Sequence, residues 1–158
     1  MKTNAVRILD KNKIDYEIIN YESDGFMEGT KIAEKLGQSF SQTFKTLVTT
    51  GKSREHYVFV LPVDKELDLK AAAKAVGEKS VEMLFVKDIT AVTGYVRGGC
   101  SPIGMKKKFK TVIHSSAKEF DTIMFSGGRL GTQIKMSPTA LAALIDATFC
   151  DIVLNQDK

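Results

Sequence analysis

The sequence predicts an α/β fold of the α+β type, with helices around a mixed, curved and partly barrel-like β-sheet. Amphipathic stretches that carry helix-capping residues occur among short runs rich in β-branched and aromatic residues. Between residues 111 and 136, three such runs follow one another without a helix, which disfavours a regular doubly wound sheet. No repeat, low-complexity tract or linker divides the 158 residues. We therefore expect a single domain over residues 1–158.

Capping residues and apolar periodicity predict five helices. Thr3, Asp68 and Ser137 are suited to helix N-caps, because their side-chain oxygens can accept from the first free N–H groups. Gly37 and Gly77 are suited to end helices in the left-handed conformation. The first four predicted helices cover a segment from Thr3 to about Asn12, residues 31–36, residues 69–76 and a short segment from Asp88 to Gly94. The last helix begins at Pro138, and one of its faces carries Leu141, Leu144, Ile145 and Thr148.

The strands are predicted from the β-branched and aromatic runs. Residues 43–50 and 56–62 suggest a hairpin, with Gly51, Lys52 and Ser53 between the two strands. Residues 82–86 suggest either a strand or a helical turn. The other predicted strands cover residues 14–21, 111–115, 122–125, 132–136 and 150–154.

Composition excludes several classes of protein. Apolar residues make up 43% of the chain, which argues against disorder, and no apolar stretch approaches the roughly 20 residues that cross a bilayer. The first residues lack the features of a signal peptide, so we expect a cytoplasmic protein without a membrane partner. The two cysteines and two histidines form no close metal-ligand pair, and we expect neither a metal nor a cofactor. The net charge of +4 permits contact with nucleic acid without requiring it.

Two glycine-rich segments are the first candidates for a site. One contains Gly98, Gly99, Cys100, Ser101, Pro102, Ile103 and Gly104, and the other runs from Ser126, Gly127 and Gly128 to Gly131. Small residues let backbone N–H groups approach a ligand, as in an oxyanion hole or a phosphate-binding nest. A tight surface turn is the competing interpretation. Neither segment has the spacing of a P-loop, a GxGxxG signature or a serine-hydrolase elbow.

Lys45 is the sharpest single candidate. Strand alternation places it on the same face as Leu47 and opposite Phe44 and Val48. In a pocket, its ammonium group could hold a carbonyl oxygen, a carboxylate or a phosphate, and desolvation would lower the pKa of Lys45. The alternative is a solvent-facing lysine on an edge strand.

Other candidates have equally plain alternatives. Lys106, Lys107 and Lys108 could hold a nucleic-acid backbone or form an ordinary solvated turn. Three apolar or aromatic residues are further candidates, namely Tyr21, Phe26 and Met27. They could close a small pocket or stack on a base, and the alternative is that they belong to the core. Cys100 could be a reactive thiol in a redox protein or a structural residue.

Six motifs occur in order along nearly the whole chain. They are Tyr21-Glu22-Ser23-Asp24, Phe44-Lys45-Thr46-Leu47, Leu67-Asp68-Leu69-Lys70, Thr93-Gly94-Tyr95, the segment from Gly98 to Gly104, and Ser126-Gly127-Gly128. With this set, the chain closely resembles the YbaK/EbsC family of aminoacyl-tRNA deacylases, which are related to the editing insertion of bacterial prolyl-tRNA synthetase.

The resemblance implies a trans-editing hydrolase that deacylates mischarged tRNA, above all Cys-tRNA(Pro), with prolyl-tRNA synthetase as a possible partner. In this family the substrate's own thiol attacks the ester, so the protein has to position the ester and stabilise charge. Lys45 matches the essential lysine of the family, and we expect catalytic roles for Lys45, Gly98 and Gly99. From their charge, we expect Lys106, Lys107 and Lys108 to contact tRNA. Tyr21, Phe26, Gly98, Gly99 and Ser126 match positions at the family's substrate pocket. The substrate-binding residues that we expect are Tyr21, Phe26, Met27, Thr46, Cys100, Ser101, Pro102, Ser126, Gly127, Gly128 and Gln133.

The second glycine segment departs from the family pattern. That pattern commonly reads Ser-Gly-Gly-Lys-Arg-Gly-Leu-Asp, whereas this chain has Arg129, Leu130, Gly131, Thr132 and Gln133 after the two glycines. A carboxylate could pair with the substrate's amino group, and a neutral amide gives a weaker hydrogen bond. Two alternatives therefore stay open: a deacylase for another small aminoacyl group, and a non-enzymatic module that binds tRNA or a synthetase.

Overall fold

The strands of the protein form two sheets. The computed structural model describes residues 2–155, and within them a three-stranded sheet has the order β1 (Glu17–Asn20), β7 (Thr132–Met136), β6 (Ile123–Arg129). A five-stranded sheet has the order β4 (Val81–Met83), β2 (Phe44–Gly51), β3 (His56–Pro62), β5 (Lys110–His114), β8 (Thr148–Cys150). The first is antiparallel, and the second mixes antiparallel pairs with the parallel pairs β3–β5 and β5–β8.

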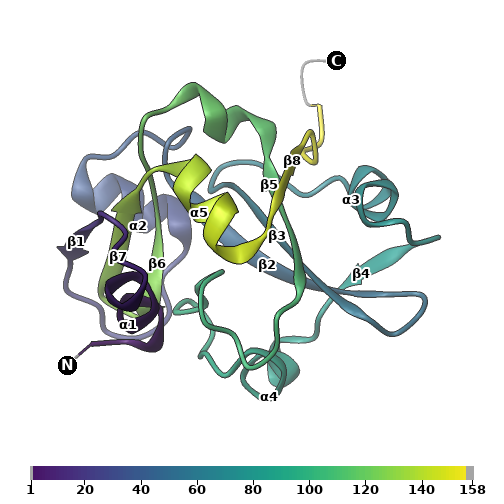
Figure 1. The fold of residues 1–158 in the computed structure, drawn as a ribbon, viewed down its shortest axis with the longest axis horizontal. Helices are drawn as coiled ribbons and strands as arrows, with labels where there is room; N and C mark the ends of the chain where they lie inside the picture. The colour runs from purple at the N-terminus through teal and green to yellow at the C-terminus, as the bar shows by residue number, and fades with distance from the viewer. Residues whose placement is uncertain (1, 156–158) are drawn as a thin grey trace.

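The predicted mixed α/β fold is confirmed, but its sheet is divided. Where we predicted one partly barrel-like sheet, the two sheets meet through a bridge between Thr43 and Met124. Figure 1 shows α1 (Asn4–Lys11) and α2 (Gly29–Leu36) beside the three-stranded sheet, and α3 (Leu69–Val76) at the opposite end, near β4. The short α4 (Ile89–Thr93) lies below β2, and α5 (Pro138–Ile145) lies in front of the middle of the molecule. The predicted extent of the domain stays a prediction, because residues 1 and 156–158 lie outside the described residues.

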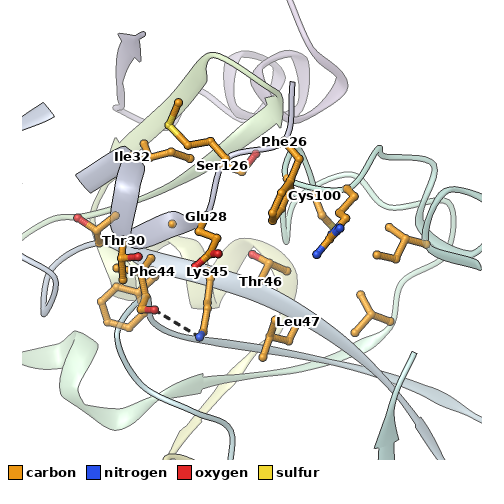
Figure 2. Close-up of a pocket in the computed structure, with 18 of the residues that line it drawn as sticks. Phe26, Glu28, Thr30, Ile32, Phe44, Lys45, Thr46, Leu47, Cys100 and Ser126 are labelled. Atoms are coloured by element: carbon orange, nitrogen blue, oxygen red, sulfur yellow. Dashed lines mark hydrogen bonds between the residues drawn. The ribbon is translucent and has the colours of Figure 1, made fainter. Parts of the chain in front are cut away.

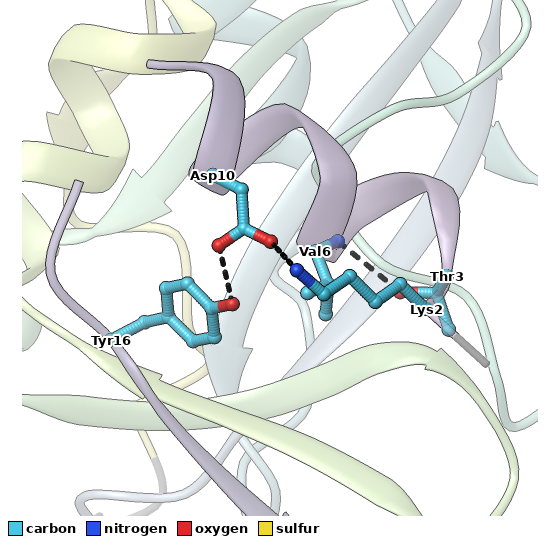
Figure 3. Close-up of polar contacts among 5 residues, drawn as sticks. All are labelled: Lys2, Thr3, Val6, Asp10 and Tyr16. Atoms are coloured by element: carbon cyan, nitrogen blue, oxygen red, sulfur yellow. Dashed lines mark hydrogen bonds and ion pairs between the residues drawn. The ribbon is translucent and has the colours of Figure 1, made fainter. Parts of the chain in front are cut away.

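Local capping explains where the helices begin and end. The Thr3 hydroxyl accepts from the N–H of Val6 at 3.2 Å, and Asp68 accepts from the N–H groups of Lys70 and Ala71. Gly37 and Gly77 have φ of 67° and 75°, the left-handed conformation that ends a helix. The N-cap of α1 is also near a surface cluster in which Asp10 accepts from Lys2 and from the Tyr16 hydroxyl (Figure 3).

The hairpin of β2 and β3 separates two hydrophobic cores. Val58 and Val60 belong to a core cluster with Phe44, whereas the alternate residues Phe59 and Leu61 belong to a second cluster beneath α3. A strand buried on both faces reads as a continuous apolar run, as residues 58–62 do. This arrangement holds β2 firmly in place, and β2 carries Lys45.

Several predicted elements differ from the observed ones. The predicted strand 14–21 is shorter in the structure, where it is β1. For residues 82–86 we predicted either a strand or a helical turn, and both occur: β4 ends at Met83, and a 3₁₀ turn (Val86–Asp88) follows. The short helix begins at Ile89 and not at Asp88, whose side chain makes no capping bond. Thr148 lies in β8 and not on the last helix, because Asp146, with φ of 59°, ends α5. The predicted strand 150–154 begins earlier and ends at Cys150, although Val153 pairs with Leu67 in a bridge.

The second glycine segment belongs to a strand. We predicted a loop from Ser126 to Gly131, but β6 continues to Arg129 through a bulge between Ser126 and Arg129. Gly128 has φ of 105°, which few other residues adopt, and so permits this bulge. The glycines therefore change the direction of the end of β6.

None of the helices in residues 2–155 combines the length and apolar character that crossing a membrane requires.

We expect the stability of the fold to decrease below neutral pH because of His114. This buried side chain accepts the N–H of Ile152 at Nδ1, 3.2 Å away, and burial lowers the pKa of His114 despite the nearby carboxylates of Asp151 and Glu119. Since the unfolded chain binds its proton at a higher pH, stability is fully present above the unfolded pKa of about 6.5 and falls below it. Protonation also removes the acceptor of Ile152, which costs about 1–3 kcal/mol.

Urea unfolding between pH 7.5 and 5 measures this effect. His114→Asn keeps an acceptor near Nδ1 but does not titrate, so its unfolding free energy should vary less with pH than that of the wild type. His56→Asn is the matched control and should retain the wild-type slope. Equal slopes for all three proteins would contradict the prediction.

Candidate functional site

The two glycine segments lie against each other. A Cβ built on Gly99 would be 2.9 Å from Cα of Arg129 and 3.1 Å from N of Leu130, both backbone atoms. A Cβ on Gly98, whose φ is 84°, would be 2.8 Å from the Leu130 side chain and 3.0 Å from the ring of Phe26. Contact at this range needs glycine, so the segments form one wall built largely from backbone.

The beginning of α1 holds both segments. The Thr3 hydroxyl, which caps the helix, also donates to the carbonyl oxygen of Gly127 at 2.6 Å. The side-chain amide of Asn4 donates to the carbonyl oxygen of Gly104 at 2.8 Å. Beneath them, the Tyr95 hydroxyl donates to Ile103 O at 2.5 Å, and burial raises the pKa of Tyr95 to about 12. Residues far apart in sequence thus fix the wall.

Beside this wall is a cavity of about 380 Å³ that collects most of the predicted pocket residues. The ones that line it are Tyr21, Phe26, Met27, Lys45, Thr46, Gly98, Cys100, Ser126 and Gln133. Figure 2 shows Lys45 and Thr46 on β2, with Glu28 above Lys45 and with Phe26 and Cys100 toward the other end. This volume is within the usual range of pockets that bind small molecules.

Lys45 lies at the cavity and not in bulk solvent. Its side chain is half-buried, and Nζ donates to Val63 O at 3.4 Å. Desolvation lowers the pKa of Lys45, while the carboxylates of Glu66, Asp64 and Glu28 act in the opposite direction. The site therefore presents an ammonium group that is only weakly held by the protein.

Glu28 is a cavity residue that the sequence analysis missed. It occupies the N-cap position of α2, yet its carboxylate makes no capping bond, and within residues 2–155 it has no hydrogen-bond or ion-pair partner. Its own segment gave no signal, because the predicted helix began at residue 31 and glutamate is not a favoured N-cap residue. Its charge acts on Lys45 without a direct ion pair, so the carboxylate can still receive a second cation.

Gln133 is buried and already hydrogen-bonded. The amide of Gln38 donates to Gln133 Oε1 at 2.7 Å, and Gln133 donates back to Gln38 Oε1 at 3.2 Å. Thr43 donates to the same Gln38 oxygen at 3.1 Å. The position that is acidic in the family pattern is therefore part of a neutral amide pair in this chain.

Thr46 carries an unsatisfied hydroxyl at the cavity. Its Oγ1 is buried and finds no hydrogen-bond partner in the described part of the chain. Buried polar groups normally have partners, and one without a partner is a candidate for contact with a ligand.

Several predicted residues lie outside the cavity. Ser101 is fully buried, and its hydroxyl accepts from the N–H of Ile103, while Pro102 lines a separate hollow of about 260 Å³. Gly99, Gly127 and Gly128 support the wall from behind, where Cβ atoms would contact Arg129, Thr132 and Thr3, respectively.

The predicted tRNA-binding lysines are exposed, but two have partners. Lys106 donates to Ala91 O at 3.2 Å, and Lys108 is 3.7 Å from a carboxylate oxygen of Asp146. Lys107 borders the separate hollow, away from Lys45.

Cys100 is a neutral thiol. Burial raises its pKa to about 11, and a redox thiol needs the opposite shift. Both cysteines are free, and nowhere in residues 2–155 do three His, Cys, Asp or Glu side chains gather in a way that could hold a metal ion. The site offers an ammonium group, a free carboxylate, a free hydroxyl and a backbone wall.

Comparison with known proteins identifies the family. The family described as aminoacyl-tRNA editing domain matches residues 27–144. A protein of Enterococcus faecalis that carries the provisional name Cys-tRNA(Pro)/Cys-tRNA(Cys) deacylase EbsC is 43% identical over 156 residues, 98% of this chain and 95% of that protein. The chain therefore belongs to the aminoacyl-tRNA editing domain family, and the predicted family is confirmed.

Solved structures support the fold. A provisionally assigned trans-editing enzyme for prolyl-tRNA synthetase superposes with a TM-score of 0.83 at 20% identity, covering 98% of this chain and 99% of that one. A hypothetical protein gives a TM-score of 0.86 at 20% identity, covering 96% and 99%. At this identity the likeness concerns the fold alone.

We expect Thr46→Val to lower activity on an aminoacyl ester without lowering stability. The substitution removes a hydroxyl that has no partner in the protein, so the unfolding free energy should stay equal or rise. Loss of one hydrogen bond to the substrate should reduce kcat/KM about 10-fold. Thr46→Ser should retain activity.

Thr49→Val is the matched control on the same strand. Thr49 is buried, and its hydroxyl donates to Tyr57 O at 3.3 Å, so this variant should lose stability and keep its activity per folded molecule. Full activity of a folded Thr46→Val protein would show that the hydroxyl does not contact the substrate.

Proposed function

We propose that the protein is a trans-editing hydrolase that removes a wrongly attached amino acid from tRNA, with Cys-tRNA(Pro) as its substrate. Membership in the editing family supports the reaction class, and the name of the Enterococcus faecalis relative supports the cysteinyl group. The observation that carries the proposal is the position of Lys45 in a small cavity beside a backbone wall. We further propose that the protein works in the cytoplasm, with prolyl-tRNA synthetase as a partner that presents the tRNA.

The substrate supplies its own nucleophile in the proposed reaction. The cysteinyl thiol attacks the ester carbonyl and gives up its proton, the carbon–oxygen bond to the ribose breaks, and the ribose oxygen leaves as a hydroxyl. The resulting cyclic thioester is opened by water to free cysteine. The protein has to orient the ester and stabilise the charge that develops on its carbonyl oxygen.

The cavity residues divide these tasks. The Lys45 ammonium faces the carbonyl oxygen, because its hold on Val63 O is long and easily exchanged. Thr46 offers its unpartnered hydroxyl, and Gly98 with Gly99 shapes the wall against which the acyl group lies. The Glu28 carboxylate receives the substrate's α-ammonium group, since Gln133 is neutral and bound to Gln38.

Lys45→Met tests the central assignment with a panel of mischarged tRNAs. The wild type should deacylate cysteinyl-tRNA fastest, and the variant should be at least about 100-fold slower, the usual loss when a charge-stabilising group is removed. Because burial lowers the pKa of Lys45, loss of its charge should not destabilise the fold, and thermal unfolding checks this.

The same panel separates the alternatives. If the wild type deacylates a tRNA carrying another small amino acid fastest, the altered region around Gln133 has changed the substrate specificity. Binding of tRNA without hydrolysis of any ester would favour a non-enzymatic module and overturn the proposal. Adding prolyl-tRNA synthetase measures whether that partner increases the rate.

Glu28→Gln tests recognition of the α-ammonium group. We compare cysteinyl-tRNA with 3-mercaptopropionyl-tRNA, which keeps the thiol but lacks the amino group. The variant should lose about 10- to 100-fold in kcat/KM on the first substrate, because a charge-assisted contact is removed, and little on the second. Glu34→Gln, on the same helix but paired with Lys31 outside the cavity, should leave both rates unchanged. Equal losses on the two substrates would contradict the assignment.

A further inference from the structure

Exposed apolar side chains gather where the cavity opens. Phe26, Met83 and Val86 line the cavity and are 49%, 44% and 54% exposed, and Phe85, between two lining residues, is 71% exposed. Val96, next to the lining residue Arg97, is 51% exposed. Large exposed apolar groups beside a cavity mark a surface that another molecule covers.

Each aromatic ring on this surface has a cation over it. Arg97 Cζ lies 3.9 Å from the centroid of the Phe26 ring, and Lys87 Nζ lies 5.9 Å from the centroid of the Phe85 ring. An aromatic face paired with a cation suits a flat, anionic ligand, because the ring stacks on a base while the cation meets a phosphate. We name Phe26, Phe85, Val86, Lys87 and Arg97 the rim.

We propose that the rim binds the 3′-terminal nucleoside of the aminoacylated RNA, with the base stacked on Phe85 and the preceding phosphate at Lys87. The inference rests on the proposed function. When the acyl group lies at Lys45, its ester oxygen belongs to the terminal ribose, which must then lie at the opening. The base and the next phosphate extend from that ribose across the rim.

The rim fits an RNA end better than it fits a protein. Each ring of the rim has a cation beside it, and the five rim residues include two cations and no carboxylate, which suits a polyanion. Unpaired RNA bases are bound by stacking on aromatic and arginine planes, the two groups present here. The rim also continues directly into the cavity through Phe26, Val86 and Arg97.

Three esters of cysteine test the proposal: cysteinyl-tRNA, cysteinyl adenosine and cysteine ethyl ester. Phe85→Ala should lower kcat/KM about 10-fold on the first two, within the range that stacking on one aromatic side chain supplies, and should not change hydrolysis of the ethyl ester. Lys87→Ala should weaken only the reaction of cysteinyl-tRNA and should reduce its dependence on salt by about one phosphate contact.

Matched controls come from the same chain. Leu69→Ala removes an exposed apolar side chain that does not line the cavity, and Lys118→Ala removes a cation 5.3 Å from the ring centroid of Phe149. Neither should alter any of the three rates.

The outcomes separate this inference from the proposed function. No hydrolysis of any ester by the wild type would overturn the proposed function itself. An active wild type with equally active Phe85→Ala would overturn the rim alone. An effect of Phe85→Ala that appears only when prolyl-tRNA synthetase is added would assign the rim to a protein partner and also overturn the inference.

Discussion

The contact between the two glycine segments is the constraint on which the site depends. Gly99 is so close to the backbone of Arg129 and Leu130 that no side chain fits between them. That contact sets one wall of the cavity, and the bonds from Thr3 and Asn4 fix its two sides. A helix at the beginning of the chain thus determines the shape of a cavity whose lysine, Lys45, is on β2.

The same rigidity makes it possible to keep a lysine at the cavity. β2 is held by β3 on one side and β4 on the other, and Phe44 and Val48 anchor it in the first core. Lys45 therefore cannot move into solvent without disturbing a buried strand. Its desolvation costs free energy, which the three carboxylates around it partly offset. The fold tolerates this cost because β2 is paired with neighbouring strands and anchored in the core.

Features set by neighbouring residues were predictable from the sequence, and features set by distant residues were not. Thr3, Asp68 and Gly77 act locally, so the helices they bound were predicted almost to the residue. The bulge in β6 and the separation into two sheets depend on contacts between remote strands. The resemblance placed Lys45 and Ser126 in one pocket, and strand alternation alone left Lys45 undecided. Glu28 and Gln38 were missed because nothing in their own segments shows which residue they face.

The charges at the site suggest a division of recognition between two groups. In the family pattern, one acidic residue follows the second glycine segment, whereas here Gln133 forms a closed amide pair with Gln38. A buried amide pair satisfies its own hydrogen bonds and so gives shape rather than charge. The remaining cavity carboxylate, Glu28, lies on the side of Lys45, so an ammonium and a carbonyl oxygen can be held by opposite charges a short distance apart. An aminoacyl ester presents these two groups on adjacent carbon atoms, so the proposed roles of Glu28 and Lys45 would distinguish an α-amino acid ester from a simple ester.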